Sequence, residues 1–172
     1  RTRSELGPVG ILVTSAGIEN FTPLADITDE LWDRIIGVNL TGTFACVQAA
    51  IPDMVAAGWG RIVTIASSSA QSGAPNMAHY VSSKGGVISM TKAIAVEFAR
   101  SGITANTIPP TLVDTPMARK AEAAGDFIGV DVGAPMVPVG RAATPDDIAA
   151  AAAFLCSEDA EYITGQVISV NG

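Results

Sequence analysis

Tyr80 and Lys84 are the residues whose types and spacing most directly suggest chemistry. Residues four apart on a helix lie on one face, with Cβ atoms about 5–6 Å apart. An ammonium group at that range is expected to lower the pKa of a phenol toward neutral pH, because a nearby opposite charge favours the ionised form. Such a tyrosine can give a proton to a carbonyl oxygen or take one from an alcohol. Ser67 could hold the same oxygen. The set indicates carbonyl/alcohol interconversion, which needs a hydride partner.

The tyrosine–lysine pair alone is weak evidence, because many helices carry an aromatic core residue and a solvated lysine at this spacing. The surrounding sequence favours chemistry. Apolar runs at 11–17 and 61–66 predict buried parallel strands, and Ser67 follows the second run directly. Asn39 lies in a long helical pattern with a glycine on either side. These are poor interior helix residues, so we expect a kink or a broken hydrogen bond there.

The elements that must position these residues alternate along the chain. We expect the tail of a helix at residue 1, a helix beginning at Thr28 and ending near Gly58 with a break or kink at Pro52, and a helix beginning at Thr144. Further helices are expected at 77–100 and near 115–124, and strands at 9–14, 61–66, 103–108 and 163–170. This alternation, with right-handed crossovers, predicts an α/β fold with a doubly wound parallel sheet and helices on both faces.

The ordered set of motifs resembles the short-chain dehydrogenase/reductase family over the whole chain, from Gly10 to Gly172. The resemblance implies a Rossmann-like fold and an oxidoreductase that uses NAD or NADP to interconvert a ketone and a secondary alcohol. The implied catalytic residues are Asn39, Ser67, Tyr80 and Lys84. In such enzymes the tyrosine is the acid/base, the lysine lowers its pKa and binds the nicotinamide ribose, the serine polarises the carbonyl, and the asparagine holds a relay water.

The resemblance also implies contacts to the nicotinamide end of the cofactor, by Ala16, Gly17, Tyr80, Lys84, Pro110, Val113 and Thr115. Thr14 and Ser15 stand where the family has two asparagines. We expect this change to weaken the sheet locally without loss of chemistry. Thr111 replaces a glycine of the family pattern, and a β-branched residue would be strained there if its φ were positive.

No Gly-x-x-x-Gly-x-Gly or Gly-x-Gly-x-x-Gly turn occurs in this sequence, although the family carries a Gly-rich phosphate-binding turn after its first strand. We therefore interpret residues 1–172 as a single, N-terminally truncated domain, with residues 109–143 as a substrate-lid insertion. Gly85 and Gly86 predict close helix packing, and in relatives this helix helps to build a two-fold dimer interface. Apolar lid residues suggest an apolar substrate portion, or packing of the lid itself; they are Met117, Phe127, Ile128, Val130 and Met136.

Composition limits the other classes of function. The chain is 48% hydrophobic and 16% charged, which favours a sheet covered on both faces and surface buried between subunits, in a homodimer or homotetramer. A net charge of −7 without a basic cluster argues against nucleic-acid binding. We expect no membrane span, because no run of 18 apolar residues or signal-peptide pattern occurs.

The few cysteines and the single histidine bear on compartment and metal binding. Cys46 and Cys156 are expected to be buried thiols in a reducing cytoplasm. His79 is the only histidine, which argues against a multi-histidine metal site and a Ser-His-Asp triad. We expect it at the surface or in the substrate pocket beside Tyr80.

The leading hypothesis is a reductase or dehydrogenase of small carbonyl/alcohol substrates, similar to the 3-oxoacyl-thioester reductases or the hydroxysteroid and alcohol dehydrogenases. A second hypothesis is a non-catalytic, dimerising fragment of such an enzyme, unable to bind cofactor alone. A third, an epimerase or dehydratase of the extended branch, would need a longer C-terminal substrate domain. The end of the chain at an expected final strand counts against it.

Overall fold

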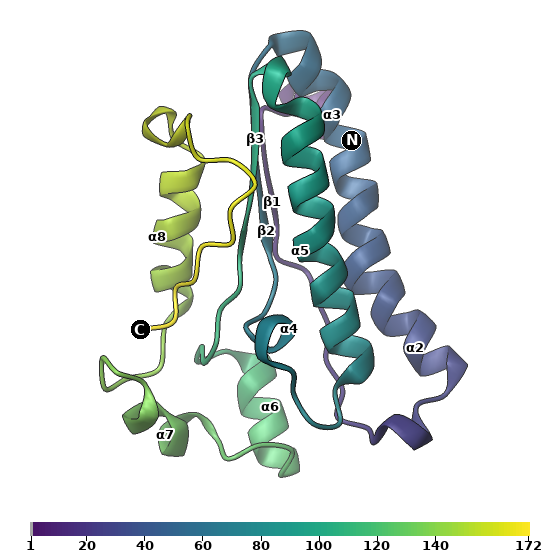
Figure 1. The fold of residues 1–172 in the computed structure, drawn as a ribbon, viewed down its shortest axis with the longest axis vertical. Coiled ribbons are helices and arrows are strands. Elements are labelled where there is room, and N and C mark those ends of the chain that lie inside the picture. The colour runs from purple at the N-terminus through teal and green to yellow at the C-terminus, as the bar shows by residue number, and fades with distance from the viewer. Residues whose placement is uncertain (1) are drawn as a thin grey trace.

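The computed structural model describes residues 2–172. Within that range a parallel sheet has its strands in chain order, β1 (Ile11–Thr14), β2 (Gly60–Ile65) and β3 (Ile103–Ile108). Ile11 lies opposite Arg61 and Gly60 opposite Ile103. Every residue of β3 is buried, and so are the first five of β2. The expectation that the run at 11–17 is a buried strand is wrong: β1 is an edge strand of this sheet, and only Thr14 of its four residues is buried. Figure 1 shows helices on both faces, as the sequence predicts.

One face of the sheet is covered by two long helical segments (Figure 1). The first comprises α2 (Asp29–Ile36), the π-helical η2 (Gly37–Thr41) and α3 (Gly42–Ala57). The second is α5 (Ala78–Phe98), which ends in the 3₁₀ turn η3 (Ala99–Ser101). Their core against the sheet is built on fully buried Met54, Ile62 and Ile103.

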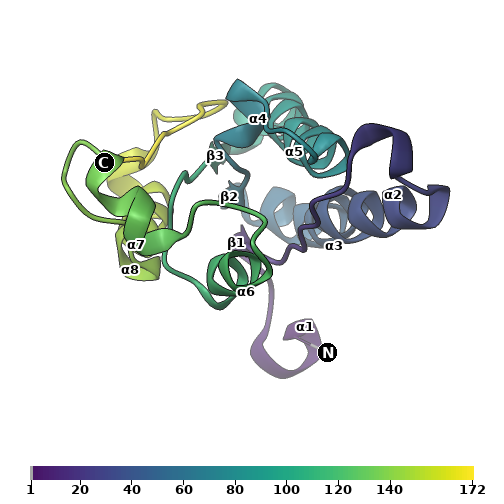
Figure 2. The same ribbon diagram turned by 90° about the horizontal axis from the view of Figure 1, so that it is seen from below.

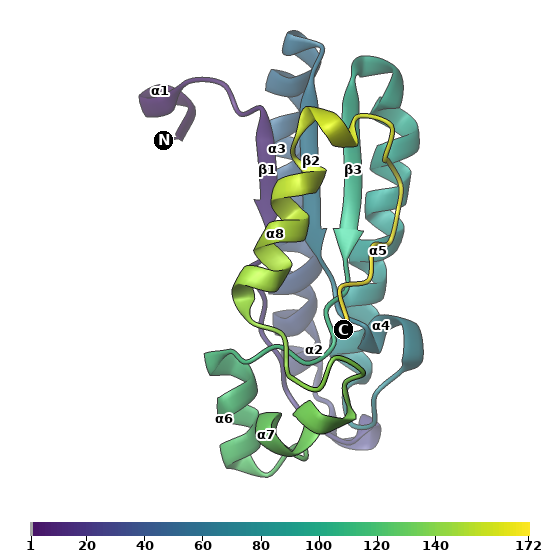
Figure 3. The same cartoon turned by 90° about the vertical axis from the view of Figure 1, so that its left-hand side faces the viewer.

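The other face is covered by α8 (Pro145–Leu155), followed by the 3₁₀ turn η5 (Glu158–Ala160) (Figures 1 and 3). Val63 and Ile108 of the sheet pack with Ile148 and Leu155 of α8. The helix start predicted at Thr144 is confirmed, and it carries a capping box: Thr144 Oγ1 accepts a hydrogen bond from the Asp147 amide, and the Asp147 carboxylate accepts one from the Thr144 amide.

Other helix ends also follow the sequence signals. Thr28 caps α2 by accepting a hydrogen bond from the Leu31 amide, and Gly58 ends α3 in the left-handed region. Pro52 lies inside α3 without ending it, so the predicted break there is wrong; the irregularity of this segment is the π-turn at Asn39. The expected helix tail at the chain start is α1 (Thr2–Leu6), which stands apart from the sheet, and residue 1 lies outside the described range (Figure 3).

Residues 109–143 form the insertion at the carboxyl ends of the strands (Figures 1 and 2). It contains α6 (Pro116–Ala124), α7 (Val130–Gly133) and η4 (Ala134–Met136). A parallel bridge between Val113 and Ala143 ties its two ends together. Arg119 forms ion pairs with Asp114, Glu122 and Asp131 at 2.8, 3.1 and 3.0 Å, which join the start of the insertion to α7.

The expected strand at 163–170 is not a regular strand. One bridge joins Val167 to Thr107 of β3, and the rest of the segment is irregular. Backbone hydrogen bonds still join the segment to β3: the Gly165 amide donates to the Ala105 carbonyl, the Thr107 amide to the Gln166 carbonyl, and the Ile168 amide to the Thr107 carbonyl. Side chains supplement this pairing, because Asn106 accepts a hydrogen bond from the Gln166 amide at 3.0 Å and Thr164 Oγ1 accepts one from the Ala105 amide at 3.1 Å.

Three expectations about burial are wrong. Cys46 is exposed and Cys156 is only partly buried. His79 is fully buried, and neither ring nitrogen has a hydrogen-bond partner among the described residues; burial lowers its pKa. His79 lies one turn before the buried Ser83 and Val87 on the sheet-facing side of α5. The next residue, Tyr80, points about 100° away, so adjacency in sequence does not place the histidine in the pocket.

The continuous helical segment Asp29–Ala57 is long and apolar enough, by length and composition alone, to cross a membrane. This is weak evidence for a span, because core helices of globular domains pass the same test. Val47, Ala50 and Met54 of this segment pack into the core beside the sheet.

Candidate functional site

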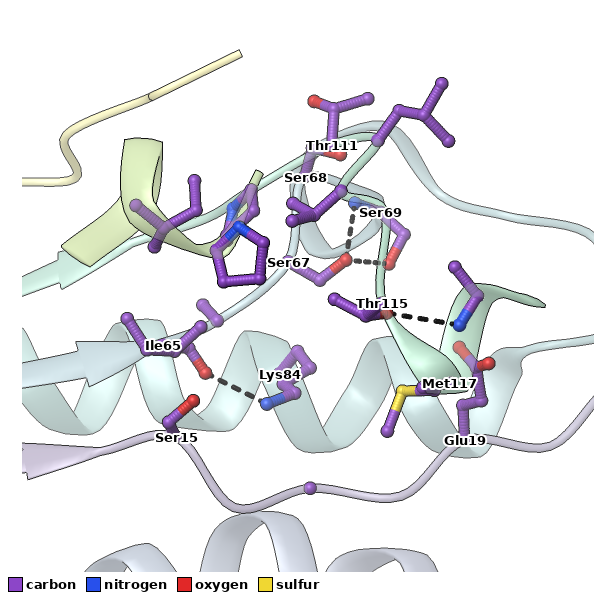
Figure 4. Close-up of a pocket in the computed structure, with 18 of the residues that line it drawn as sticks. Ser15, Glu19, Ile65, Ser67, Ser68, Ser69, Lys84, Thr111, Thr115 and Met117 are labelled. Atoms are coloured by element: carbon purple, nitrogen blue, oxygen red, sulfur yellow. Dashed lines mark hydrogen bonds between the residues drawn. The ribbon is translucent and has the colours of Figure 1, made fainter. Parts of the chain in front are cut away.

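The carboxyl ends of the three strands open into a cavity of about 880 Å³. In parallel α/β sheets this edge is where ligands bind. Figure 4 shows side chains converging on it from several segments, among them the loop after β1, the loop after β2, α5 and the start of α6. Of the sequence-predicted residues, those that line the cavity are Gly17, Ser67, Tyr80, Lys84, Pro110, Val113 and Thr115. Asn39 and Ala16 are not among the lining residues.

Tyr80 and Lys84 lie on the same face of α5, as their spacing predicts. Lys84 Nζ is 5.9 Å from the centroid of the Tyr80 ring, and it donates a hydrogen bond of 2.9 Å to the carbonyl oxygen of Ile65 (Figure 4). Lys84 is only 5% exposed. Burial disfavours the charged form and lowers the pKa of this amine to about 8.

The expected lowering of the Tyr80 pKa is wrong for this structure. Burial raises the pKa of the phenol, hydrogen bonding by Ser67 opposes the rise, and the Glu19 carboxylate adds to it. The lysine does not reverse this effect because burial acts on both groups. With its pKa of about 8, the amine is already neutral at the pH where the phenol would ionise, and a neutral amine does not stabilise a phenolate.

The Ser67 hydroxyl is fixed by a neighbour. Its Oγ lies 2.8 Å from Ser69 Oγ, and it accepts a second bond of 3.3 Å from the Ser69 amide (Figure 4). Ser69 begins the short helix α4 (Ser69–Ser72). From the sequence we singled out Ser67 alone and missed this role of Ser69. The repeated hydroxyl two residues on was the available signal.

Asn39 supports the site from outside the cavity. It lies in the π-turn η2, which confirms the expected helix irregularity, and it is fully buried. Its side chain accepts a hydrogen bond from the Ile18 amide at 2.8 Å and donates to the Ile18 carbonyl at 3.0 Å and to Ser83 Oγ at 3.0 Å. Asn39 therefore clamps the loop that follows β1. The water relay stays a prediction.

The predicted cofactor residues suit the nicotinamide end of a dinucleotide. A Cβ added to Gly17 would lie 3.3 Å from Lys84 Nζ, so only the bare backbone leaves this approach open. The parallel bridge that pairs Val113 with Ala143 is made by the backbone groups of Leu112 and Asp114. Val113 itself therefore contributes no hydrogen bond to that bridge. The Thr115 hydroxyl caps α6 by accepting a bond of 3.2 Å from the Ala118 amide (Figure 4).

Thr111 does not carry the strain that its sequence position suggested. Among the non-glycine residues of the described chain, only Asn76 has a positive φ, of 60°. Thr111 is exposed at the mouth of the cavity, and its β-branched side chain is accommodated in an ordinary backbone conformation.

The five apolar residues expected in the lid differ in their surroundings. Met117 and Phe127 line the cavity, whereas Val130 is buried within the insertion. Ile128 and Met136 are exposed. Only the first two residues support an apolar substrate portion in this structure.

The two adjacent glycines of α5, Gly85 and Gly86, differ in how closely neighbouring residues pack against them. A Cβ on Gly86 would lie 2.7 Å from a Leu40 methyl, so close packing is confirmed there, whereas Gly85 has no atom within 4 Å of that position.

Comparison with known proteins agrees with this geometry. The family model described as enoyl-(acyl carrier protein) reductase matches residues 1–172. The chain is 40% identical over its full length to an acetoacetyl-CoA reductase of Rhizobium meliloti, covering 70% of that protein. It is 39% identical to the 3-oxoacyl-[acyl-carrier-protein] reductase MabA of Mycobacterium bovis, with 96% of this chain and 66% of that protein covered. The chain belongs to the short-chain dehydrogenase/reductase family, whose members are NAD(P)-dependent oxidoreductases.

Solved structures place the fold within the same family. A gluconate 5-dehydrogenase of Burkholderia cenocepacia in complex with NADP and tartrate superposes with a TM-score of 0.91 at 33% identity, covering 99% of this chain and 66% of that one. The aldohexose dehydrogenase of Thermoplasma acidophilum gives 0.92 at 33% identity, covering 99% and 69%. The chain therefore spans about two thirds of the length of these relatives.

Proposed function

We propose that this protein interconverts a ketone and a secondary alcohol by hydride transfer with NAD or NADP, and that a 3-oxoacyl thioester is its first substrate class to test. The observation that carries the proposal is the convergence of Tyr80, Ser67 and Lys84 on one cavity at the carboxyl ends of the strands. The names of the relatives at 40% and 39% identity support the thioester.

Residues of this chain can carry out the proton transfer to or from the substrate oxygen. A bound nicotinamide supplies or accepts the hydride. Tyr80 holds its proton at neutral pH, because burial raises its pKa, so it is set to donate to a carbonyl oxygen in the reductive direction. Ser67, oriented by Ser69, holds that oxygen. Alcohol oxidation needs the ionised phenol and is therefore expected to become faster as the pH rises.

The remaining assignments complete the proposal. Residues 109–143 act as the substrate lid of a single domain of which residues 1–172 form a part. Pro110, Val113, Thr115 and Gly17 hold the nicotinamide end of the cofactor, with Ala16 behind them. The protein works in the cytoplasm as a homodimer or homotetramer, and apolar side chains left exposed on α3 and α5 support that assembly; they include Phe44, Val55 and Val96.

The test is oxidation of NADH and NADPH by the full-length protein with acetoacetyl-CoA. Tyr80→Phe should lower turnover by about 100-fold or more, because it removes the proton donor, while NAD(P)H binding measured by fluorescence is retained. Tyr162→Phe is the matched control, since Tyr162 is fully exposed. Wild-type turnover in Tyr80→Phe would refute the acid/base assignment, and no turnover by the wild type with any ketone would refute the proposed function.

A further inference from the structure

Glu19 brings a carboxylate into the cavity that holds Tyr80. It lies in the loop after β1, and Figure 4 shows its side chain beside Met117 at the start of α6. Among the described residues that line the cavity it is the only carboxylate, and Lys84 is the only cation. Glu19 helps to raise the pKa of Tyr80, but it neither gives nor takes the proton in the transfer proposed above.

The backbone that carries Glu19 is held on both sides. The preceding residue, Ile18, is bonded through both its amide and its carbonyl to the Asn39 side chain, at 2.8 and 3.0 Å. Three residues on, the Thr22 amide donates to the Asn76 carbonyl oxygen at 2.8 Å. A side chain on a fixed backbone presents its charge at a defined place in a binding site, which is what selective recognition requires.

The carboxylate itself has no donor. No hydrogen bond or ion pair of residues 2–172 involves Glu19, which is half-buried. Burial raises the pKa of Glu19, and the like charge of the Asp126 carboxylate raises it further. Lys84 is committed to the Ile65 carbonyl. Arg34 and Lys120 line an adjoining hollow of about 530 Å³ that Glu19 also borders, without an ion pair to it.

A half-buried carboxylate has lost part of its hydration, and a ligand group that donates a hydrogen bond would compensate for that loss. An anionic group in the same place would add a second like charge and be disfavoured. The rest of the wall supplies hydroxyls at Ser67, Ser68 and Ser69 and apolar surface at Met117 and Phe127. Among the described residues, the wall thus combines one carboxylate with hydroxyls and apolar surface, and its one cation, Lys84, is bonded to the Ile65 carbonyl.

We propose that Glu19 determines the substrate class of this cavity, favouring ketones that carry a hydroxyl near the reacting carbonyl over plain ketones and over keto acids. The proposal rests on the proposed function, because it assumes that Tyr80 reduces a ketone in the same cavity. Glu19 acts as an acceptor for the substrate hydroxyl and as a charge that repels a substrate carboxylate.

The test compares kcat/KM for hydroxyacetone, butanone and pyruvate, with acetoacetyl-CoA as a further ketone, in the full-length protein. Hydroxyacetone and butanone differ only by a hydroxyl in place of a methyl group. The wild type should prefer hydroxyacetone by about 10-fold or more, since hydrogen bonds to charged groups are among the strong ones. Glu19→Leu should abolish that preference, and Glu19→Gln should relax the discrimination against pyruvate. Glu158→Leu, which removes an exposed carboxylate of η5, is the control.

The outcomes separate the two proposals. A preference for hydroxyacetone that disappears in Glu19→Leu, while butanone turnover persists, supports the assignment and shows that the variant is folded. Equal ratios in the wild type and in Glu19→Leu would overturn it, as would turnover confined to acetoacetyl-CoA. Loss of turnover with every ketone in the wild type would instead overturn the proposed function.

Discussion

Replacing Lys84 with methionine is expected to stabilise the fold at pH 7, although it removes a proposed catalytic residue. Lys84 is 5% exposed, and its one hydrogen bond among the described residues is to the Ile65 carbonyl. The side chain of methionine has a similar length and no charge. Active sites often hold groups that cost stability in return for function, so a stabilising change here is physically reasonable.

The magnitude follows from the pKa of Lys84. Burial lowers it from 10.5 to about 8, which at 1.36 kcal/mol per pKa unit costs the folded state about 3 kcal/mol when the amine is charged. Losing the bond to Ile65 costs about 1 kcal/mol. The net expectation is a gain of about 2 kcal/mol in the free energy of unfolding at pH 7.

The sign of the pH dependence is fixed by the same shift. Between pH 8 and 10.5 the unfolded chain binds more protons than the folded chain, so the stability contributed by this group rises with pH in that range. Above pH 10.5 the penalty is absent, because both states are neutral. The advantage of Lys84→Met should therefore shrink from pH 8 upward and end as a loss of about 1 kcal/mol.

Urea unfolding of the wild type and Lys84→Met at several pH values measures the difference directly. The same pair made in a Tyr80→Phe background removes any contribution of the phenol to the titration. Lys92→Met on the exposed side of α5 is the matched control and should change stability little at any pH. A Lys84→Met protein less stable than the wild type at pH 7, or a difference that does not vary with pH, would refute this account.

Three further changes test the support of the site. Asn39→Ala should lower the free energy of unfolding by about 1–3 kcal/mol in urea, since it leaves buried backbone groups of the β1 loop unpaired; an unchanged midpoint would contradict the clamp. Gly85→Ala should stabilise α5 by about 0.5–1 kcal/mol, whereas Gly86→Ala should lose that gain against Leu40; equal effects would exclude close packing. Thr111→Gly should leave NAD(P)H affinity in titrations equal or better, and a large loss would reveal a specific threonine contact.

The fold was largely predictable because its signals are local. The positions of β1 and β2 were evident as apolar runs, although β1 is mostly exposed, and the helix ends at Thr28, Gly58 and Thr144 followed capping chemistry that acts within a few residues. The irregularity at Asn39 was also predicted, from poor helix formers alone. The last strand is less regular than expected, because its backbone bonds to β3 are mixed with bonds from the backbone to the side chains of Asn106 and Thr164, which short-range patterns do not reveal.

The candidate site was predicted in its members but not in its electrostatics. Spacing placed Tyr80 and Lys84 on one helix face, and motif order brought Ser67 to the same edge of the sheet. The direction of the Tyr80 pKa shift was wrong because a helix spacing contains no information on burial, which here outweighs the effect of the lysine. Ser69 and Glu19 were missed because their importance depends on neighbours that are distant in sequence or that share one small cavity.

The sequence by itself therefore determined the class of chemistry, the order of strands and helices, and the residues available at the carboxyl edge, because these depend on residue type and on short-range periodicity. Only the tertiary structure decided which of those side chains are desolvated, which are held by partners and which are left without one. Burial and long-range contacts set those properties, and they arise only when the lid, the sheet and α5 close around a common cavity.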